Sequence, residues 1–599
     1  MTNGVIVVGQ KRFKQLAYIF LIAISLLMFR LMQIQLFDTK SFSKHHINLI
    51  EASVNQRTQE VILDNGRGKF FDKYHNPISF HTIPSLILFP FLNNMDWDKE
   101  KVAKILGVSI ESLLLAIKDA KEPVVFGDPD PFVLSNEQME AINQLEIPGV
   151  FAVYKQFDRE LTTAAQLIGI LGENEKLLKE RYPNKKLPIN TLIGITGLQK
   201  SFDEFLLQEE KTKLLYHVDG IGGPLFGIDV KYVDPSNPFY PVHVITTLDM
   251  EIQKAAEKIV DENQIKKGGL ILIDIESNTI LANVSRPSLN IEDPYTNDNV
   301  KNFMFTQSIP GSVFKTVIAA AAIDYNLVPK NRIFDCNQTI YGKKDTKYQK
   351  GNLNFKESFA QSCNHTFGTL AKELAKIDEK IIETYSEKLG LINEVGWSGD
   401  VFHFENFTQL SDEDKGIIFI SDEERMDPNY VAQTGIGQRN VRITPLQAAN
   451  MMATIARGGK KEMVRAVSSI EYKNGTTLYH FQKKPLLSSE QLAPYTVMKL
   501  QQLLREVVTN EKGTGRMLNN LPYQVAGKSG TAETNRYIDE KHKSKDTELQ
   551  NSWFVGYFPF EKPKYALAVV KLDTLSSEKS ATHTFYDMVN FLYQYDKKN

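Results

Sequence analysis

The chain opens with an apolar stretch that is long enough to cross a lipid bilayer. Three basic residues stand before it: Lys11, Arg12 and Lys14. No charge follows between Leu16 and Arg30, and apolar character then resumes as far as Phe37. The 22 positions from Leu16 to Phe37 make about 33 Å of helix at about 1.5 Å per residue. The sequence therefore predicts a transmembrane anchor at residues 16–37.

The charges beside this stretch predict how the rest of the chain is placed. Basic residues favour the cytoplasmic side, so residues 1–15 are expected to be a short cytoplasmic tail and everything after Phe37 to lie outside the cell membrane. A cleaved signal peptide and a buried core helix are the alternatives. No small-x-small cleavage site follows the stretch, and the terminal position with its flanking charge argues against a core helix. No second uncharged apolar stretch of this length occurs, which predicts a single-pass protein.

A chain of 599 residues is too long for one hydrophobic core, so several domains are expected. The pattern of expected strands and helices changes near residue 240. Residues 38–240 mix short β-like runs with polar helical stretches and show no cluster of catalytic residue types, so we expect a non-enzymatic spacer or docking domain. In residues 241–599 a strand, a helix capped by Asp249 and a hairpin precede a long helical middle. Strands return at 553–557 and 565–572. This order predicts an α+β domain in which helices cover an antiparallel sheet.

Composition excludes several function classes. The 70 basic and 72 acidic residues give a formal net charge of −2, and no basic patch is interleaved with aromatic residues, so nucleic acid is not an expected partner. Cys336 and Cys363 could pair, but two cysteines in 599 residues do not make a disulfide framework. Metal-ligand spacings such as H-E-x-x-H are absent from the sequence, so no metal site is expected.

Three short strings in the C-terminal half carry the chemistry: Ser312-Val313-Phe314-Lys315, Ser362-Cys363-Asn364 and Lys528-Ser529-Gly530-Thr531. In this order they reproduce the S-x-x-K, S-x-N and K-[ST]-G signature of enzymes that acylate a serine. Each string alone is weak, because about two or three S-x-x-K matches arise by chance in a chain of this size. Their joint occurrence, with spacings of 362 − 312 = 50 and 528 − 362 = 166, is what carries the prediction.

The first string predicts a nucleophile and its base. It opens the run Val313–Ile323, which is apolar almost all round and therefore reads as a buried helix. The i, i+3 spacing places Ser312 and Lys315 on one helical face, with Ser312 in the first turn. A serine needs a base to take its proton, and a lysine can act as that base only when it is neutral. Burial and a neighbouring cation both lower a lysine pKa.

The other two strings predict substrate contacts. Ser362 and Asn364 can present a hydroxyl and an amide together from a tight turn between helices, where the hydroxyl can relay a proton and the amide can hold a peptide. Lys528 to Thr531 are expected on a strand. A glycine at Gly530 lets another backbone approach closely, which suits a peptide bound by strand addition. Lys528 and Thr531 would then bind its carboxylate.

With their flanks, these strings closely resemble those of class B penicillin-binding proteins. The segments that carry the resemblance are Pro310–Lys315, Thr434–Gln438, Thr444–Gln447, Lys528–Glu533 and Trp553–Tyr557, and upstream Arg67–Asp72 and Gly194–Gln199. The chain departs from the family at Lys73-Tyr74-His75, where Arg-Asn-Gly is usual. The resemblance implies a transpeptidase domain at 241–599 and a pedestal, or dimerisation, domain at 38–240.

The implied activity is that of a peptidoglycan D,D-transpeptidase without a cofactor. Lys315 would take the proton of Ser312, which attacks the penultimate D-Ala carbonyl of a stem peptide, and Ser362 would relay the proton to the departing D-Ala. Main-chain amides of Ser312 and Thr531 would form the oxyanion hole. The implied substrate-binding residues are Asn364, Lys528, Ser529, Gly530 and Thr531. The implied partners are peptidoglycan stem peptides, β-lactams, the cytoplasmic membrane and, as a further candidate, a membrane glycan polymerase.

Three alternatives share the motifs. A membrane-anchored β-lactamase would release acylated antibiotic rapidly and would not need a pedestal of about 200 residues. A β-lactam sensor would need a signalling domain, whereas only about fifteen residues precede the anchor. A non-catalytic scaffold for wall synthesis would not need its motif residues intact, and here all five are present: Ser312, Lys315, Ser362, Asn364 and Lys528.

Overall fold

The computed structural model describes residues 2–43, 48–159, 162–185, 187–208, 210–219, 231–346, 349–486, 491–538, 544 and 547–599. Of residues 2–11, 51 and 54–56 it describes the backbone alone, so the side chain of Lys11 lies outside the description. The chain forms two compact units: residues 1–66, 81–157 and 210–236 make the first, and residues 67–80, 158–209 and 237–599 the second. The domain boundaries expected from the sequence stay predictions.

The N-terminal helix has the length and composition expected of an anchor. Helix α1 (Thr2–Met32) continues into a π-helical turn, η1 (Gln33–Phe37). Within the described residues, Arg12–Phe37 is the one helical segment long and apolar enough to cross a membrane, and none of its apolar window is buried against protein. The segment supports the predicted single span, while the side of the membrane on which each end lies stays a prediction.

The first unit is built on two small sheets, with strand orders β1-β8-β9 and β4-β3-β5. Helices α3 and α4 pack against the second sheet through buried Val102, Leu106 and Leu113, which share a core with Leu86 and Leu88 of β3. The elements are α2 (Leu49–Gln56), β1 (Thr58–Asp64), β3 (Phe80–Leu88), η2 (Pro90–Asn94), α3 (Lys99–Leu106), α4 (Ile110–Ile117), β4 (Val124–Val125), α5 (Asn136–Asn143), β5 (Val150–Asp158), β8 (Thr212–His217) and β9 (Lys231–Val233).

The second unit is organised around a five-stranded sheet of order β12-β11-β21-β20-β19, in which every neighbouring pair is antiparallel. The strands are β11 (Gly268–Asp274), β12 (Thr279–Arg286), β19 (Ala526–Tyr537), β20 (Glu548–Phe558) and β21 (Tyr565–Thr574). The hairpin and the two late strands lie where the sequence predicts them, so the α+β prediction is confirmed. Strand β19 is at one edge of this sheet.

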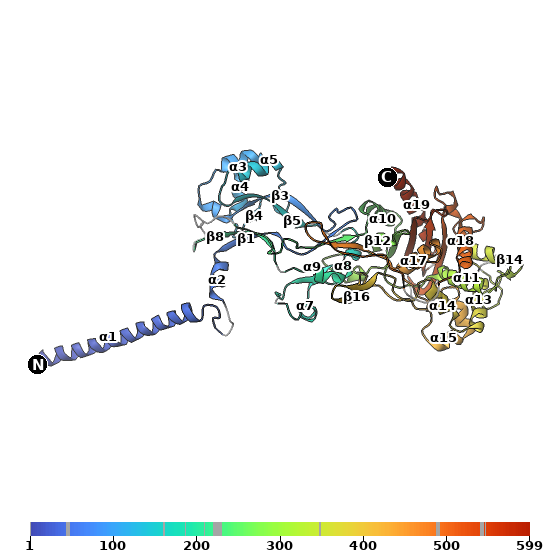
Figure 1. Ribbon diagram of the computed structural model, residues 1–599, viewed down its shortest axis with the longest axis horizontal. Coiled ribbons are helices and arrows are strands. Elements are labelled where there is room, and N and C mark those ends of the chain that lie inside the picture. Colours follow the sequence, from blue (N-terminus) through green and yellow to red (C-terminus); the bar gives the residue numbers. More distant parts are fainter. Residues whose placement is uncertain are drawn as a thin grey trace. The chain divides into compact units, whose positions relative to one another are not determined.

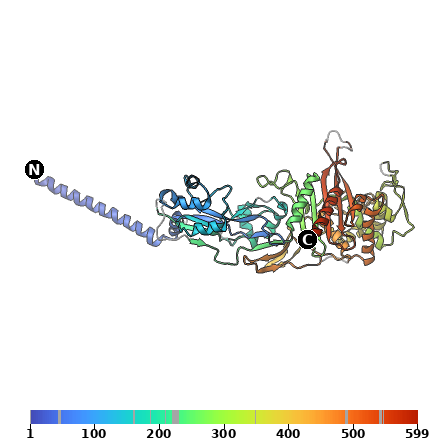
Figure 2. The same cartoon turned by 90° about the horizontal axis from the view of Figure 1, so that it is seen from above.

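Helices cover both faces of this sheet, because its strands bury side chains on both sides (Figure 1). Leu270 and Leu272 of β11 face a core shared with α10 (Met250–Glu262) and α19 (Ala581–Lys598). Ile271 and Ile273 alternate with them and face the larger core. Figure 2 shows α19, in red, beside the green α10, in agreement with the contacts between these helices.

The remaining described elements of the second unit form four minor sheets and the helical layer; three of these sheets are the two-stranded pairs β6-β7, β13-β14 and β15-β16. A four-stranded sheet has the order β18-β17-β10-β2. The elements are β2 (Lys69–Phe71), α6 (Ala165–Ile168), β6 (Leu171–Glu173), α7 (Glu175–Arg181), β7 (Leu192–Gly194), α8 (Gly197–Ser201), α9 (Asp203–Leu206), β10 (His243–Thr246), η3 (Thr296–Asp298), η4 (Gly311–Phe314), α11 (Lys315–Asp324), β13 (Ile333–Asp335), β14 (Asn352–Asn354), α12 (Phe355–Ala360), α13 (Asn364–Ile377), α14 (Ile381–Lys388), β15 (Ser398–Val401), β16 (Phe404–Thr408), α15 (Asp422–Met426), α16 (Pro428–Thr434), α17 (Pro445–Ala456), β17 (Val467–Glu471), β18 (Thr477–His480), α18 (Pro494–Thr509) and η5 (Arg516–Asn520).

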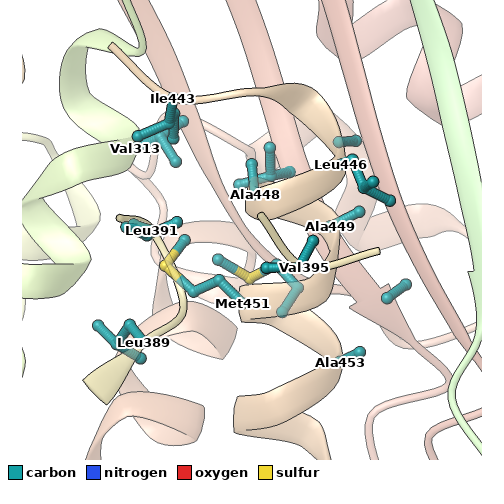
Figure 3. Close-up of a cluster of buried hydrophobic side chains, with 14 of the residues drawn as sticks. Val313, Leu389, Leu391, Val395, Ile443, Leu446, Ala448, Ala449, Met451 and Ala453 are labelled. Carbon is teal, nitrogen blue, oxygen red and sulfur yellow. The ribbon is translucent and has the colours of Figure 1, made fainter. Parts of the chain in front are cut away.

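Helix α17 runs through the larger core and holds the segment before Ser312. Its start is a capping box: the Thr444 side chain accepts from the Gln447 amide, the Gln447 side chain accepts from the Thr444 amide, and Pro445 fills the first helical position. The conspicuous Thr444–Gln447 string is thus a helix start. Its flanking residue Ile443 lies beside Val313 (Figure 3) and exchanges two backbone hydrogen bonds with Ser308, of 2.9 and 3.1 Å.

The two upstream segments that carried the family resemblance meet in the second unit. Arg67, from the first segment, donates to Gln199 of the second at 2.9 Å and to Asp203 at 2.7 Å. All three side chains are buried, and Asp203 also accepts the Gly194 amide at 2.8 Å. A buried charge requires such pairing, so these residues hold the short elements from β7 to α9 together.

Asp249 caps α10, as the sequence predicts, and also carries an ion pair. Its side chain accepts the amides of Glu251 and Ile252, both at 3.1 Å, and the hydroxyl of Tyr595 at 2.7 Å. Lys73, one of the departures from the family pattern, lies 2.8 Å from its Oδ2. Lys73 thus joins the segment after β2 to the start of α10.

Asp249→Ala should therefore cost more than an ordinary helix cap. We expect the free energy of unfolding to fall by about 3 kcal/mol, because the change removes the cap and leaves Lys73 and Tyr595 without their partner. Chemical denaturation followed by circular dichroism measures it.

The matched control is Asp427→Ala. Asp427 caps α16 by accepting two amides and forms no ion pair with another described residue. The substitution should cost about 1 kcal/mol. Equal losses in the two variants would contradict the role of the ion pair.

Candidate active site

Ser312 and Lys315 lie at the entrance to α11, but on a tighter turn than the sequence predicts. Residues Gly311–Phe314 form the 3₁₀ turn η4, and the α-helix begins at Lys315. Ser312 is partly exposed, whereas Lys315 is fully buried. In the part of the chain that the structure describes, no hydrogen bond joins the two side chains. The predicted buried helix over Val313–Ile323 is confirmed in place, and its first turn is 3₁₀.

Lys315 instead points its ammonium group at the second motif. Its Nζ donates to the carbonyl and to Oγ of Ser362, both at 3.0 Å, and to Oδ1 of Asn364 at 2.6 Å. The ring of Phe367 lies 5.6 Å from the same nitrogen. These three acceptors match the three donors of a lysine ammonium, so hydrogen bonds hold the group at the second motif.

The second motif occupies the predicted turn between helices. Ser362 lies between α12 and α13 with φ = +56°, a left-handed conformation that non-glycine residues rarely adopt. Cys363 caps α13 and is joined by a disulfide to Cys336, with their Cα atoms 5.8 Å apart. The pairing that the sequence left open is therefore present. It ties the loop after β13 to the turn that carries Ser362.

Lys528 reaches the same hydroxyl from the third motif. It is fully buried on edge strand β19, and its Nζ lies 3.1 Å from Ser362 Oγ and 3.1 Å from its neighbour's carbonyl, Ser529 O. A hydroxyl oxygen has two acceptor lone pairs, so Ser362 accepts from both lysines at once. The three motifs thus converge on one oxygen atom.

The burial of these lysines changes their proton affinity. Burial, with Lys528 and Lys350 as neighbouring cations, lowers the pKa of Lys315 well below its usual value of 10.5. Burial, with Lys350 beside it, lowers the pKa of Lys528 to about 7. Desolvation disfavours the charged form of a basic group, and a second cation adds to the effect. A lysine held neutral at ordinary pH can accept a proton, as the base assignment requires.

Lys350 is a third lysine that sequence reasoning missed. Its Nζ donates to the carbonyls of Gln361 and Ser362, the latter at 3.4 Å, and its pKa is lowered by burial despite the nearby Asp345. It stands in no recognisable motif, and the loop that carries it is brought to the turn by folding. No signal in the sequence would have found it.

Glycines allow the backbones of three segments to meet at the site. A Cβ on Gly530 would lie 2.4 Å from the Pro310 carbonyl, and one on Gly311 would lie 2.3 Å from the Thr531 carbonyl. A Cβ on Gly437 would lie 1.9 Å from the Gly311 carbonyl. Real Cβ atoms do not approach so closely, so glycine is required at each position. These contacts place the third motif directly against the turn of Ser312.

Further side chains fix the walls of the site. Gln438 donates to the Thr531 carbonyl at 3.3 Å, and Trp553 of β20 donates to the Ile309 carbonyl at 2.9 Å. Ser529 donates to the hydroxyl of Thr514 at 2.7 Å. Gln438 and Trp553 belong to the strings that carried the resemblance, whereas nothing in the sequence singled out Thr514.

Comparison with known proteins identifies the family. A model described as the penicillin binding protein transpeptidase domain matches residues 268–590, more than half of the chain. The chain belongs to this family. The match spans all three motifs, and the resemblance to class B penicillin-binding proteins is confirmed.

Curated relatives extend the similarity beyond the transpeptidase domain. The chain is 24% identical over 539 residues to stage V sporulation protein D of Bacillus subtilis, covering 84% of this chain and 73% of the relative. It is 24% identical over 553 residues to peptidoglycan D,D-transpeptidase FtsI of Buchnera aphidicola, covering 87% and 84%. It is also 24% identical over 441 residues to peptidoglycan D,D-transpeptidase MrdA of Acinetobacter baumannii, covering 68% and 61%.

Solved structures share the fold over most of the chain. One of these structures is a peptidoglycan synthase complex that concerns the structural coordination of polymerization and crosslinking. A chain of that complex matches with a TM-score of 0.63 and 19% identity, covering 96% of this chain and 97% of the other. A complex of a penicillin-binding protein with MreC from Helicobacter pylori matches with a TM-score of 0.56 and 19% identity, covering 90% and 99%. The transpeptidase fold preceded by a pedestal, as predicted, agrees with these full-length matches.

The burial of Lys528 should destabilise the folded protein at neutral pH. Lys528 has a lowered folded pKa, so between pH 7 and 10.5 the unfolded chain binds more protons than the folded one, and stability rises with pH. Lys528→Met removes this dependence, and we expect it to raise the free energy of unfolding at pH 7 by at least about 2 kcal/mol. The gain should shrink as the pH approaches 10.5.

Thermal unfolding of both proteins at several pH values measures the effect. Lys376→Met, at an exposed position on α13, is the control and should change neither stability nor its pH dependence. A gain that stays constant from pH 7 to 10.5 would contradict the lowered pKa.

Proposed function

We propose that the protein is a peptidoglycan D,D-transpeptidase that works through an acyl-enzyme on Ser312. The observation that carries the proposal is the convergence of Lys315 and Lys528 on Ser362 Oγ. It brings the three motifs together around a buried lysine, Lys315, whose pKa is lowered by burial and by neighbouring cations. The names of the curated relatives support the activity, and the three motifs support the serine mechanism.

In the acylation step Lys315 would act as the general base. It is fully buried, its pKa is strongly lowered, and it follows Ser312 by one helical turn. Ser312 Oγ would attack the carbonyl of the penultimate D-Ala while its proton passes to Lys315 Nζ. Catalytic hydrogen bonds are often long in a free enzyme and shorten in the substrate complex, so the present separation of the two groups is compatible with this step. The amides of Ser312 and Thr531 would bind the oxyanion, since the Thr531 backbone lies against Gly311.

The departing D-Ala needs a proton, which Ser362 would deliver. Its hydroxyl accepts hydrogen bonds from Lys315 and Lys528, so a proton taken by Lys315 can pass through Oγ to the leaving amine. An amine from a second stem peptide would then attack the acyl-enzyme, and the reverse proton path would regenerate Lys315. No cofactor enters this sequence.

The edge position of β19 supports peptide binding by strand addition. The Thr531 side chain is exposed, and Lys528 is positively charged in part of the molecules at neutral pH because its pKa is about 7. We assign carboxylate recognition to Lys528 and Thr531, with Ser529 and Gly530 lining the strand, and we assign to Asn364 a contact with the substrate peptide. The same contacts would accept β-lactams.

The placement of the chain follows from the N-terminal helix. Residues 1–15 would be cytoplasmic, and both compact units would lie outside the cytoplasmic membrane, where peptidoglycan is found. Residues 38–240 would form the pedestal. A membrane glycan polymerase is the proposed partner, in line with the coupled polymerization and crosslinking named for the similar complex.

Substitution of either Ser312 or Lys315 should by itself prevent or strongly slow acylation of the protein. Ser312→Ala should abolish covalent labelling by fluorescent penicillin while the melting temperature stays near that of the wild type. Lys315→Arg should slow acylation at least about a thousandfold, because a guanidinium stays protonated and cannot serve as a base. Mass spectrometry of the labelled peptide locates the adduct.

Two results would contradict this proposal. An adduct that persists in folded Ser312→Ala would exclude Ser312 as the nucleophile, and rapid acylation of Lys315→Arg would exclude the lysine base. The stability of the wild-type adduct separates a transpeptidase from a β-lactamase, since a β-lactamase would release the antibiotic within seconds to minutes.

Lys350 should tune the pH dependence of acylation. Its charge lowers the pKa of both Lys315 and Lys528, so Lys350→Met should raise both pKa values. The acidic limb of the acylation profile should move to higher pH, and the rate at pH 7 should fall roughly threefold to tenfold.

Lys343→Met removes the same charge from an exposed position of the same loop and should leave the profile unchanged. A uniform loss of rate at all pH values in Lys350→Met would point to a disturbed Ser362 turn instead, and would contradict the electrostatic role.

A further inference from the structure

The second unit contains a cavity that none of the motif residues line. It has a volume of about 670 Å³ and lies among the end of α11, the start of α12 and one face of α18. A cavity of this size matches those that hold small organic ligands, which are about 300–1,000 Å³. The motif residues Ser312, Lys315, Ser362 and Lys528 do not contribute to its walls.

One part of the lining is apolar and aromatic. Val328, Phe355, Leu503 and Phe560 contribute to it, and Phe560 stacks on the buried ring of Tyr557 at a centroid distance of 6.2 Å. Because these side chains come from four separate segments, they form walls rather than a single exposed stripe. Such a lining favours a flat apolar or aromatic group.

The rest of the lining is strongly basic. Lys330, Lys356, Lys499 and Arg505 line the cavity, together with a single acidic residue, Glu506. Glu506 is already used, since it lies 2.8 Å from Lys356 Nζ. Among the described residues, no carboxylate forms an ion pair with Lys330, Lys499 or Arg505. Glu506 and Glu561 interact electrostatically with Arg505. The four basic residues of the lining outnumber these two carboxylates, so the cavity carries an excess of positive charge.

Arg505 is the best-placed of these cations. It is half-buried, and one of its guanidinium nitrogens donates to the Val525 carbonyl at 2.8 Å, which fixes the group at the start of β19. Among the described residues that is the one hydrogen bond of the guanidinium, so its other donors are available to a ligand. A guanidinium fixed in this way is suited to a carboxylate, which it can bind with two parallel hydrogen bonds.

We propose that this cavity is a second ligand site, which takes a small organic anion with an aromatic body and one carboxylate. The aromatic part would lie against Phe355, Leu503 and Phe560. The carboxylate would pair with Arg505, and Lys499 would add a second positive charge. The site does not depend on the proposed transpeptidase reaction, because it shares no residue with the motifs.

The test uses the full-length chain in lipid nanodiscs and 6-fluoro-2-naphthoate as the probe. Binding is followed by fluorine NMR, with empty nanodiscs to subtract partition into lipid. We expect saturable binding to the wild type. In Arg505→Gln and in Lys499→Gln the affinity should fall at least tenfold, because each variant loses a charge-assisted contact.

Three controls separate charge, shape and location. Lys376→Gln removes an exposed positive charge far from the lining residues in sequence and should bind like the wild type. The uncharged 6-fluoro-2-naphthamide should bind the wild type at least tenfold more weakly than the acid. Gln502→Trp fills the cavity from an exposed position of its lining and should abolish binding with the net charge unchanged, although it also removes the 3.5 Å hydrogen bond that Gln502 accepts from Lys499. Circular dichroism melts show whether each variant is folded.

Several outcomes would overturn the proposal. Binding no greater than to empty nanodiscs, or equal affinity in folded Lys499→Gln, Arg505→Gln and wild type, would exclude the site. Complete displacement of the probe by benzylpenicillin would place it at Ser312 instead. A failure of Ser312 to become acylated would contradict the proposed function and leave these binding results unaffected.

Discussion

Two buried lysines share a single hydroxyl oxygen, and the geometry of the site depends on that arrangement. Ser362 Oγ lies 3.0 Å from Lys315 Nζ and 3.1 Å from Lys528 Nζ, and no carboxylate among the described residues pairs with either ammonium. Two ammonium groups that both contact the same oxygen would repel each other strongly if both were charged in a medium of low polarity. At least one of them must therefore be neutral for much of the time. Burying two lysines close together lowers the stability of the folded state. The large apolar core formed by the helices and sheet around them offsets this loss.

The sequence predicted the parts of the site that lie within single segments. The three motifs, the cap at Asp249, the turn at Ser362 and the strand of Lys528 can all be recognised from local patterns, because capping, periodicity and glycine placement act over a few residues. The edge position of that strand depends on the whole sheet and comes from the structure. Lys350 and Thr514 could not be found in this way. Their positions beside the motifs result from packing between segments far apart in sequence, and neither carries a local signal.

The turn at Ser312 shows where periodicity is insufficient. The apolar run after Ser312 indicates a helix correctly, but it cannot reveal that the first turn is 3₁₀. The first residue of that turn is Gly311, which has φ = +56° and whose Cβ, if present, would lie 2.3 Å from the Thr531 carbonyl. Conversely, the Thr444–Gln447 string looks as distinctive as the catalytic motifs, and the structure shows that it is a helix capping box. A string that marks a family can thus serve the fold and not the chemistry.

The glycine contacts at Gly311, Gly437 and Gly530 also limit how such a site can change. Where three peptide backbones touch, the spacing is set by the thickness of peptide groups, and no choice of rotamer can widen or narrow it. Substitution of a side chain therefore has almost no means of adjusting the distance between the turn of Ser312 and the edge strand. Differences in substrate or antibiotic preference between proteins with this site should then arise from the side chains that form its walls, such as Gln438 and Thr514. The backbone contacts at the three glycines should stay the same.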